Sequence, residues 1–312
     1  MKKAMLRRLG QSLALLVLLS MFSFALMHVM PGDFAELLLI ERMGGDLPAR
    51  DVLARFKAEQ GFNDPVARQY LRWLGGILQG EPGVSFQSGD GVWAEIGLRV
   101  ENTLILAAAS IGVSLVLAVP IGVVAAARQG SAWDRLSMLL AVMGMAIPNF
   151  WYSLIMVMVF SLFLGWLPVS GYGHWTHIVL PALVIGTSTA GVTARFIRSC
   201  VLDVLSRDFI RTAHSKGLGE IRVLFGHALP NALVPVVTLL GLQIGKMFDG
   251  VVVVETIFAW PGIGRLLVES IFGRDFPVLQ LCVLVVGAVY IAVNLAVDLL
   301  VMAIDPRIRG AL

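Results

Sequence analysis

Charged residues and cysteines are scarce in this sequence of 312 residues. Only 14% of the residues are charged, whereas an ordinary soluble domain carries about 25%, so a soluble globular domain is excluded. The two cysteines, Cys200 and Cys282, support neither a disulfide framework nor a zinc site. We interpret both as packing residues.

Catalytic and cofactor-binding patterns are also missing. The sequence has no H-E-x-x-H and no G-x-S-x-G, and the nearest string to a phosphate loop, residues 241–246, is one residue short. His174 and His177 share one helical face, but two ligands without a third do not make a metal site. We therefore predict a chain that is not an enzyme, with no catalytic residue, no metal site and no cofactor of its own.

Long apolar runs are what the sequence has in excess, since 57% of its residues are apolar and its mean hydropathy is +0.83. A helix that crosses the hydrocarbon needs roughly 20 mostly apolar residues. We therefore expect an all-α integral membrane protein with six transmembrane helices, the first of them retained and not cleaved as a signal peptide. The six runs are 9–30, 103–127, 136–164, 178–197, 228–254 and 278–304.

Lysine and arginine gather at one end of these runs, and such residues stay on the cytoplasmic side. The short loops 165–177 and 255–277 hold only Arg265 and Arg274. Both termini and the loop after the fourth run are therefore predicted to be cytoplasmic. The scattered positive charge gives no reason to expect a nucleic-acid partner. The residues on the predicted cytoplasmic side are Lys2, Lys3, Arg7, Arg8, Arg128, Arg135, Arg195, Arg198, Arg207, Arg211, Lys216, Arg222, Arg307 and Arg309.

One long segment is predicted to be exported, and its apolar spacing suits two short amphipathic helices separated by the turn at 61–65. We interpret these helices as a lid packed on the spans. The predicted organisation is a transmembrane helix at 1–30, an external segment at 31–98, a transmembrane core at 99–305 with a cytoplasmic loop at 199–227, and a cytoplasmic tail at 306–312.

The segment 207–230, RDFIRTAHSKGLGEIRVLFGHALP, is a charged island between two apolar runs. Ser206 or Asp208 can cap a short helix, and Gly217 stands where a left-handed residue would end it. The helix is expected to have an apolar edge of Phe209 and Ala213. Its basic edge comprises Arg207, Arg211 and Lys216. These features leave two interpretations open: docking in a groove of another protein, or contact with anionic lipid heads.

The same island resembles the EAA loop of permeases from binding-protein-dependent ABC importers. Arg211 stands where the general loop has Glu, and this departure is usual in the dipeptide, oligopeptide, glutathione and nickel branch. Other patches of that branch are Pro31-Gly32-Asp33, GFNDPVARQYLRWL, Pro148-Asn149-Phe150-Trp151, ETIFAWPGIG and Asp305 to Arg309. The loop positions carried over are Arg211, Thr212, Ala213, Lys216, Gly217, Leu229 and Pro230.

The resemblance implies one transmembrane half of an importer with the type I ABC importer permease fold, multi-pass in the bacterial inner membrane. The implied partners are two ATP-binding subunits, which hold the ATP, a second homologous permease subunit, and a periplasmic solute-binding protein. Short peptides, glutathione and nickel chelates all stay open as solutes. An ion-coupled carrier or channel that works without an ATPase is the alternative, although carriers often show an inverted repeat and none is visible here.

Two further groups of residues are candidates for the transport path. Lys246 and Asp249 are one helical turn apart in the fifth run, and ionisable groups at membrane depth are costly enough to suggest a polar pathway. Mutual neutralisation is the other interpretation. The short segment after the fifth run is expected to form a turn at an outer gate, or a re-entrant packing element. Its residues are Glu255, Trp260, Pro261, Gly262 and Gly264.

Overall fold

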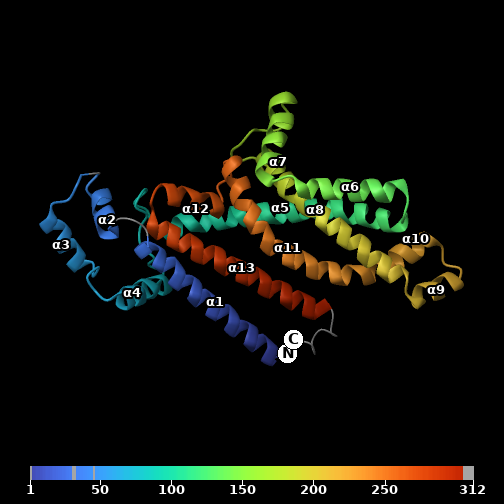
Figure 1. Ribbon diagram of the computed structural model, residues 1–312, viewed down its shortest axis with the longest axis horizontal. Coiled ribbons are helices and arrows are strands. Elements are labelled where there is room, and N and C mark those ends of the chain that lie inside the picture. Colours follow the sequence, from blue (N-terminus) through green and yellow to red (C-terminus); the bar gives the residue numbers. More distant parts are fainter. Residues whose placement is uncertain (1, 30–32, 45, 305–312) are drawn as a thin grey trace. The chain divides into compact units, whose positions relative to one another are not determined.

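The computed structural model describes residues 2–29, 33–44 and 46–304, and within them the regular elements are helices (Figure 1). This confirms the all-α class. The first helices are α1 (Lys2–Val29), α2 (Phe34–Arg42), α3 (Arg50–Glu59), α4 (Val66–Gln79), α5 (Val92–Ala127), α6 (Ala132–Ala146) and α7 (Asn149–Met156), followed by the π-helix η1 (Val157–Phe163). Then come α8 (Thr176–Leu205), α9 (Asp208–Ser215), α10 (Glu220–Val223), the π-helix η2 (Leu224–Ala228), α11 (Leu229–Ile257), α12 (Ile263–Phe272) and α13 (Phe276–Ile304).

Four helical segments are each long and apolar enough to cross a membrane: Arg7–Ala25, Val92–Ala127, Thr176–Leu205 and Phe276–Val297. The other two predicted spans are bent, by 102° within 132–163 and by 44° within 220–241. If each bent pair counts as one span, the described residues hold up to six spans. The predicted number of transmembrane helices is therefore consistent with the structure.

Prolines explain both bends. Ile147 has an extended backbone, with φ −83° and ψ 123°, because the ring of Pro148 disfavours helical geometry in the residue before it. The third run therefore divides into α6 and α7, where the sequence suggested one continuous helix. Pro235 lies inside α11, where it removes a backbone hydrogen bond and bends the helix in its first turns.

The chain divides into two compact units. The first comprises Asn102–Gly264 and the segment from Ala292, and the second comprises Lys2–Glu101 and Arg265–Ile291. In the second unit α3 and α4 are the two amphipathic helices expected in the external segment, and α2 is an additional short helix. Buried apolar residues of α2 and Phe56 of α3 form a small core there.

Helix α8 organises the first unit by packing against α6 on one side and α11 on the other. Arg198 of α8 donates two hydrogen bonds to Asp134 of α6, from Nε to Oδ1 at 2.6 Å and from a terminal nitrogen to Oδ2 at 2.8 Å. Such bidentate pairs are strong and directional. Thr193 of α8 also accepts a buried hydrogen bond of 2.9 Å from Gln243 of α11. These contacts hold three helices as one body.

Candidate functional site

Helix α9 lies in the segment 207–230, which resembles the EAA loop, and one of its faces is buried. Ile210 and Ala213 are 2% and 7% exposed and belong to an apolar core that also contains residues of α5, α8 and α11. Phe209 is 43% exposed. The predicted apolar edge of Phe209 and Ala213 was therefore wrong for Phe209: the buried edge comprises Ile210 and Ala213, and Phe209 faces outward.

The start of α9 also differs from the expectation. Arg207 is the N-cap residue, and its side chain makes no capping hydrogen bond. Ser206 is the C-cap residue of α8, and Asp208 is the first residue of α9, so neither is the N-cap of α9. Asp208 still contributes negative charge to the first helical turn, where the helix dipole favours it.

Gly217 ends α9 as predicted, with φ +76°. Its N–H donates to the carbonyl of His214 at 2.9 Å, and the N–H of Leu218 donates to the carbonyl of Ala213 at 3.4 Å. This pair of bonds is the Schellman motif. A Cβ at Gly217 would meet no atom within 4 Å. Glycine is therefore required there by backbone conformation and not by space.

The outer surface of the loop combines large apolar side chains with basic ones. Ile221 of α10 is 77% exposed and Phe225 of η2 is 57% exposed, in addition to Phe209. Arg207, Arg211, Thr212 and Lys216 are also exposed. Leu229 packs against the same apolar core as α9, and Pro230 is exposed at the start of α11. The surface thus suits a partner with an apolar groove and acidic edges.

The polar pair proposed for the pathway, Lys246 and Asp249, lies in α11. Both side chains lie outside the part of the chain that the structure describes. Their role in a pathway stays a prediction. Nearby, Gly241 faces Val297 of α13 so closely that a Cβ would overlap the valine side chain, so a small residue is needed where these two helices pack.

The segment after α11 is organised around Glu255, whose side chain is fully buried. Thr103 donates a hydrogen bond from Oγ1 to Glu255 Oε1 at 2.5 Å, and the Gly264 N–H donates to Oε2 at 2.9 Å. The Ile263 N–H donates to the same Thr103 hydroxyl at 2.9 Å. A Cβ at Gly262 would overlap the carboxylate. Glu255 therefore holds the turn that follows it against Thr103, which lies inside α5.

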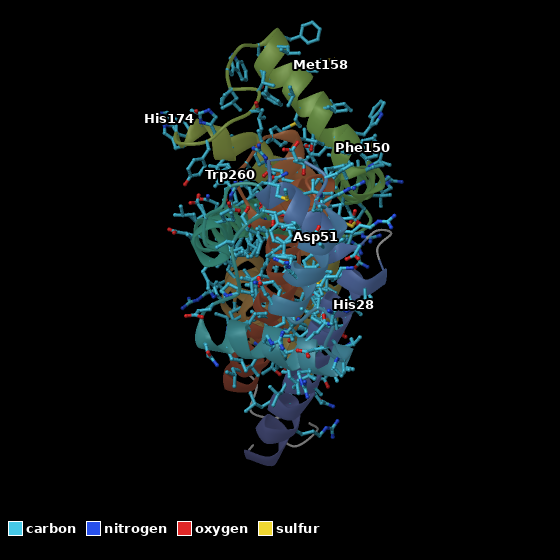
Figure 2. All side chains as sticks on the ribbon, turned by 90° about the vertical axis from the view of Figure 1, so that its left-hand side faces the viewer. His28, Asp51, Phe150, Met158, His174 and Trp260 are labelled. Atoms are coloured by element: carbon cyan, nitrogen blue, oxygen red, sulfur yellow. The ribbon has the colours of Figure 1, made fainter. Side chains whose placement is uncertain are left out.

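Asn102 holds the other half of this turn. Its carbonyl accepts a hydrogen bond from Trp260 Nε1 at 3.0 Å, and its side-chain nitrogen donates to the carbonyl of Pro261, also at 3.0 Å. The Tyr172 hydroxyl donates to Asn102 Oδ1 at 2.8 Å, and the Tyr172 ring meets the Trp260 ring edge to face. Trp260 is 4% exposed, and its position is labelled in Figure 2.

The sequence did not single out Asn102 and Thr103, although they supply these contacts. Their only local signal is that two adjacent polar residues stand where the second apolar run begins. The five predicted gate residues, Glu255 to Gly264, do come together in one buried cluster. Whether the cluster gates a path stays a prediction.

Replacing Trp260 by phenylalanine should destabilise the first unit modestly. The change keeps an aromatic ring beside Tyr172 but removes the indole N–H, and a lost hydrogen bond of this kind costs about 1 kcal/mol. Alanine should cost about 3–5 kcal/mol, because it also leaves a cavity. Unfolding of the purified chain in detergent measures both. Equal stability of the phenylalanine variant and the original chain would show that the indole hydrogen bond contributes nothing.

The described residues contain no group of three His, Cys, Asp or Glu side chains that could hold a metal ion. His174 is exposed and His177 is half-buried. The Nδ1 atom of His174 lies near the Thr176 hydroxyl, and that of His177 lies near the backbone carbonyl of His174. Figure 2 shows His174 at an outer edge.

The chain belongs to a family of transport permeases. Residues 118–310 match the family described as binding-protein-dependent transport system inner membrane component, and residues 1–107 match its N-terminal companion family. The chain is therefore a permease component of a transport system, a multi-pass membrane protein and not an enzyme. These findings confirm the resemblance seen in the sequence.

Three relatives match along nearly their whole length. The glutathione transport system permease protein GsiC of Salmonella paratyphi A is 40% identical over 97% of this chain and 98% of its own. The dipeptide transport system permease protein DppB of Escherichia coli is 37% identical over 99% of both chains. The oligopeptide transport system permease protein AppB of Bacillus subtilis is 39% identical over 97% of this chain and 98% of its own.

Solved structures with the same fold come from an ABC transporter. Two crystal forms of inward-facing conformations of the MetNI methionine ABC transporter align with TM-scores of 0.56 and 0.57 at 17% identity. They cover 66% and 67% of this chain, and 94% and 96% of the solved chains. At this identity the likeness establishes the fold alone, and it confirms the expected ABC permease architecture.

Proposed function

We propose that this chain is one transmembrane half of an ATP-driven importer for short peptides or related small solutes such as glutathione. The relatives named for dipeptides, oligopeptides and glutathione support this solute class. Nickel chelates stay a prediction from the sequence resemblance. Family membership favours an ABC importer over the alternative of a carrier or channel that works without an ATPase.

The proposed assembly contains two ATP-binding subunits, a second homologous permease and a solute-binding protein. It would lie in a bacterial inner membrane, with the α9 loop on the cytoplasmic side. ATP is held by the partner subunits, and this chain hydrolyses nothing.

The buried edge of α9 is the observation that carries the proposal. Ile210 and Ala213 share one apolar core with helices α5, α8 and α11. Protein interiors are close-packed and transmit displacement, so a partner that moves α9 would move the spans with it. Phe209, Ile221 and the basic residues of the loop remain exposed for that partner. A lipid-bound loop would need no such rigid connection to three spans.

Two further elements of the first unit receive roles in this proposal. The cluster around Glu255, with Trp260, Pro261, Gly262 and Gly264, would shape the outer gate, because it ties the end of α11 to Asn102 and Thr103 of α5. Lys246 and Asp249 would line the polar path within α11. Opening and closing would then be a rigid-body alternation of the spans, biased by ATP on the partner subunits.

Purification of the tagged chain from native membranes tests the assembly. Two ATP-binding subunits and a second permease of similar sequence should co-purify in stoichiometric amounts. Reconstituted vesicles should accumulate a dipeptide or glutathione only under two conditions. ATP must be present on the side of the membrane that carries the ATP-binding subunits, and a solute-binding protein must be present on the other side. Uptake catalysed by this chain alone would overturn the proposal and favour a carrier or channel.

A further inference from the structure

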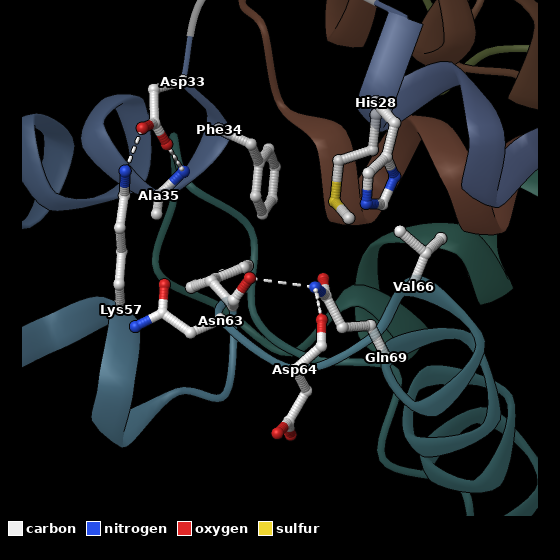
Figure 3. A pocket seen from close by; sticks show the side chains of 11 residues that line it. His28, Asp33, Phe34, Ala35, Lys57, Asn63, Asp64, Val66 and Gln69 are labelled. Carbon is white, nitrogen blue, oxygen red and sulfur yellow. Dashed lines mark hydrogen bonds and ion pairs between the residues drawn. The ribbon is translucent and has the colours of Figure 1, made fainter.

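A cavity of about 580 Å³ opens among four helices of the second unit, as the close view in Figure 3 shows. Small-molecule sites in proteins commonly measure about 300–1,000 Å³. The end of α1, the start of α2, α3 and the turn into α4 all contribute to its wall. Its lining residues are Met27, His28, Asp33, Phe34, Ala35, Lys57, Phe62, Asn63, Asp64, Val66 and Gln69.

Opposite charges stand side by side in this wall. The Lys57 ammonium pairs with Asp33 Oδ2, and the Ala35 N–H donates to Asp33 Oδ1 at 3.1 Å. Burial raises the pKa of Asp33, but the hydrogen bond and charge of Lys57 outweigh it and hold that pKa below its ordinary value. The carboxylate is therefore ionised at neutral pH. Both side chains keep part of their surface open, 38% for Asp33 and 27% for Lys57.

The side-chain amide of Gln69, elsewhere in the wall of this cavity, is fixed in place by two hydrogen bonds. Gln69 donates from Nε2 to the carbonyls of Phe62 and Asp64, at 2.9 Å each. Both amide hydrogens are thus used, and Oε1 is the part of the side chain left to accept a further hydrogen bond. The Asp64 carboxylate, by contrast, points away from the cavity in Figure 3 and pairs with Arg72.

Apolar groups complete the wall. Phe34 stands beside Phe62 in an edge-to-face arrangement with ring centroids 5.6 Å apart. Met27 and Val66 also face the cavity. The cavity therefore offers an anion, a cation, an amide acceptor and an apolar surface within one small volume.

We propose that this cavity is an external subsite for a short free peptide, with the ligand's ammonium on Asp33 and its carboxylate on Lys57. A zwitterion can add to an existing ion pair without breaking it, because Lys57 retains further N–H donors and Asp33 retains further lone pairs. The aromatic pair would contact a ligand side chain. The inference rests on the proposed function, since it places a peptide-class solute at this site.

Two sequence patches that the coupling mechanism leaves unexplained meet at this cavity. Asp33 belongs to the Pro31-Gly32-Asp33 patch, and Phe62 to Gln69 belong to the GFNDPVARQYLRWL patch. Both were singled out because they resemble the external segment of the peptide and glutathione branch. A purely structural ion pair would explain Asp33 and Lys57 but not the cavity that they face.

Titration of the full-length chain in lipid nanodiscs, without a solute-binding protein, tests this site by calorimetry. The probes are alanyl-alanine, its N-acetyl form and its C-terminal amide. Asp33→Asn and Lys57→Met should each weaken binding of alanyl-alanine about tenfold, as expected for a lost charged hydrogen bond. Glu269→Gln is the matched control: it breaks an ion pair with Arg265 in the same unit, outside this cavity, and should change nothing.

The decisive readout is the coupling between ligand group and residue. The N-acetyl form should bind the original chain about tenfold more weakly, and Asp33→Asn should weaken it no further. Likewise, the C-terminal amide should bind the original chain about tenfold more weakly than alanyl-alanine does, and Lys57→Met should weaken its binding no further. The inference would be overturned if alanyl-alanine did not bind at millimolar concentration, or if each variant weakened the binding of all three probes by the same factor. Co-purification of ATP-binding subunits and ATP-dependent uptake would still stand in that case, so the two proposals fail separately.

Discussion

Replacing Glu255 by alanine should abolish solute uptake and strongly destabilise the chain. Glu255 is fully buried and accepts hydrogen bonds from Thr103 and from the Gly264 N–H. Each buried partner left without a hydrogen bond costs about 1–3 kcal/mol, and the removed side chain leaves a cavity as well. We therefore expect a loss of about 3–5 kcal/mol in the free energy of unfolding. Chemical unfolding in detergent and uptake by reconstituted vesicles measure the two effects.

Gly262→Ala should reproduce much of this loss, because its Cβ would overlap the Glu255 carboxylate. Two controls are matched to these variants. Glu101→Ala changes an exposed acid one residue before Asn102, and Gly112→Ala adds a methyl group where no atom lies within 4 Å. Both control variants should retain the solute uptake and the stability of the original chain. A stable, active Glu255→Ala variant would show that the buried cluster is not what holds the outer segment.

Gly217→Val should uncouple ATP hydrolysis from uptake. Valine at φ +76° is strained by about 1–2 kcal/mol, so the Schellman end of α9 should rearrange and displace the exposed surface of the loop. We expect uptake to fall at least tenfold while the assembly still inserts in the membrane and hydrolyses ATP. Parallel assays of uptake and phosphate release in vesicles measure the ratio of the two.

Gly219 supplies the control for this variant. It has φ −70° and ψ 155°, which any residue adopts, and a Cβ there would also meet nothing within 4 Å. Gly219→Val should therefore keep uptake and ATP hydrolysis coupled. If both variants behave alike, backbone conformation at the end of α9 does not matter and the proposed role of the loop end is wrong.

The sequence predicts the spans well because hydrophobic length is a property of single segments. It also predicts Gly217 as a left-handed helix end, since the glycine and the short helix before it are local signals. It does not predict which side of α9 is buried. An eight-residue helix holds about two turns, and its rotation follows from the core of α5, α8 and α11, which the sequence around Phe209 does not reveal.

Contacts between distant residues are beyond local patterns as well. Glu255 is recognisable as a polar residue at the end of an apolar run, but its partner Thr103 lies 152 residues earlier in the chain. The cavity beside Asp33 likewise needs four helices to meet. Bends are an intermediate case: Pro148 and Pro235 are visible in the sequence, while the angles of 102° and 44° depend on packing.

Photo-crosslinking from the α9 loop tests the central claim most directly. A photoreactive residue at Phe209 is exposed on the surface assigned to the ATP-binding partner, and one at Leu47, 81% exposed in the segment predicted to be external, is the control. Illumination of intact membranes should join position 209 to an ATP-binding subunit and position 47 to none. Adducts at position 209 with lipid only, or capture of an ATP-binding subunit from position 47, would contradict the account.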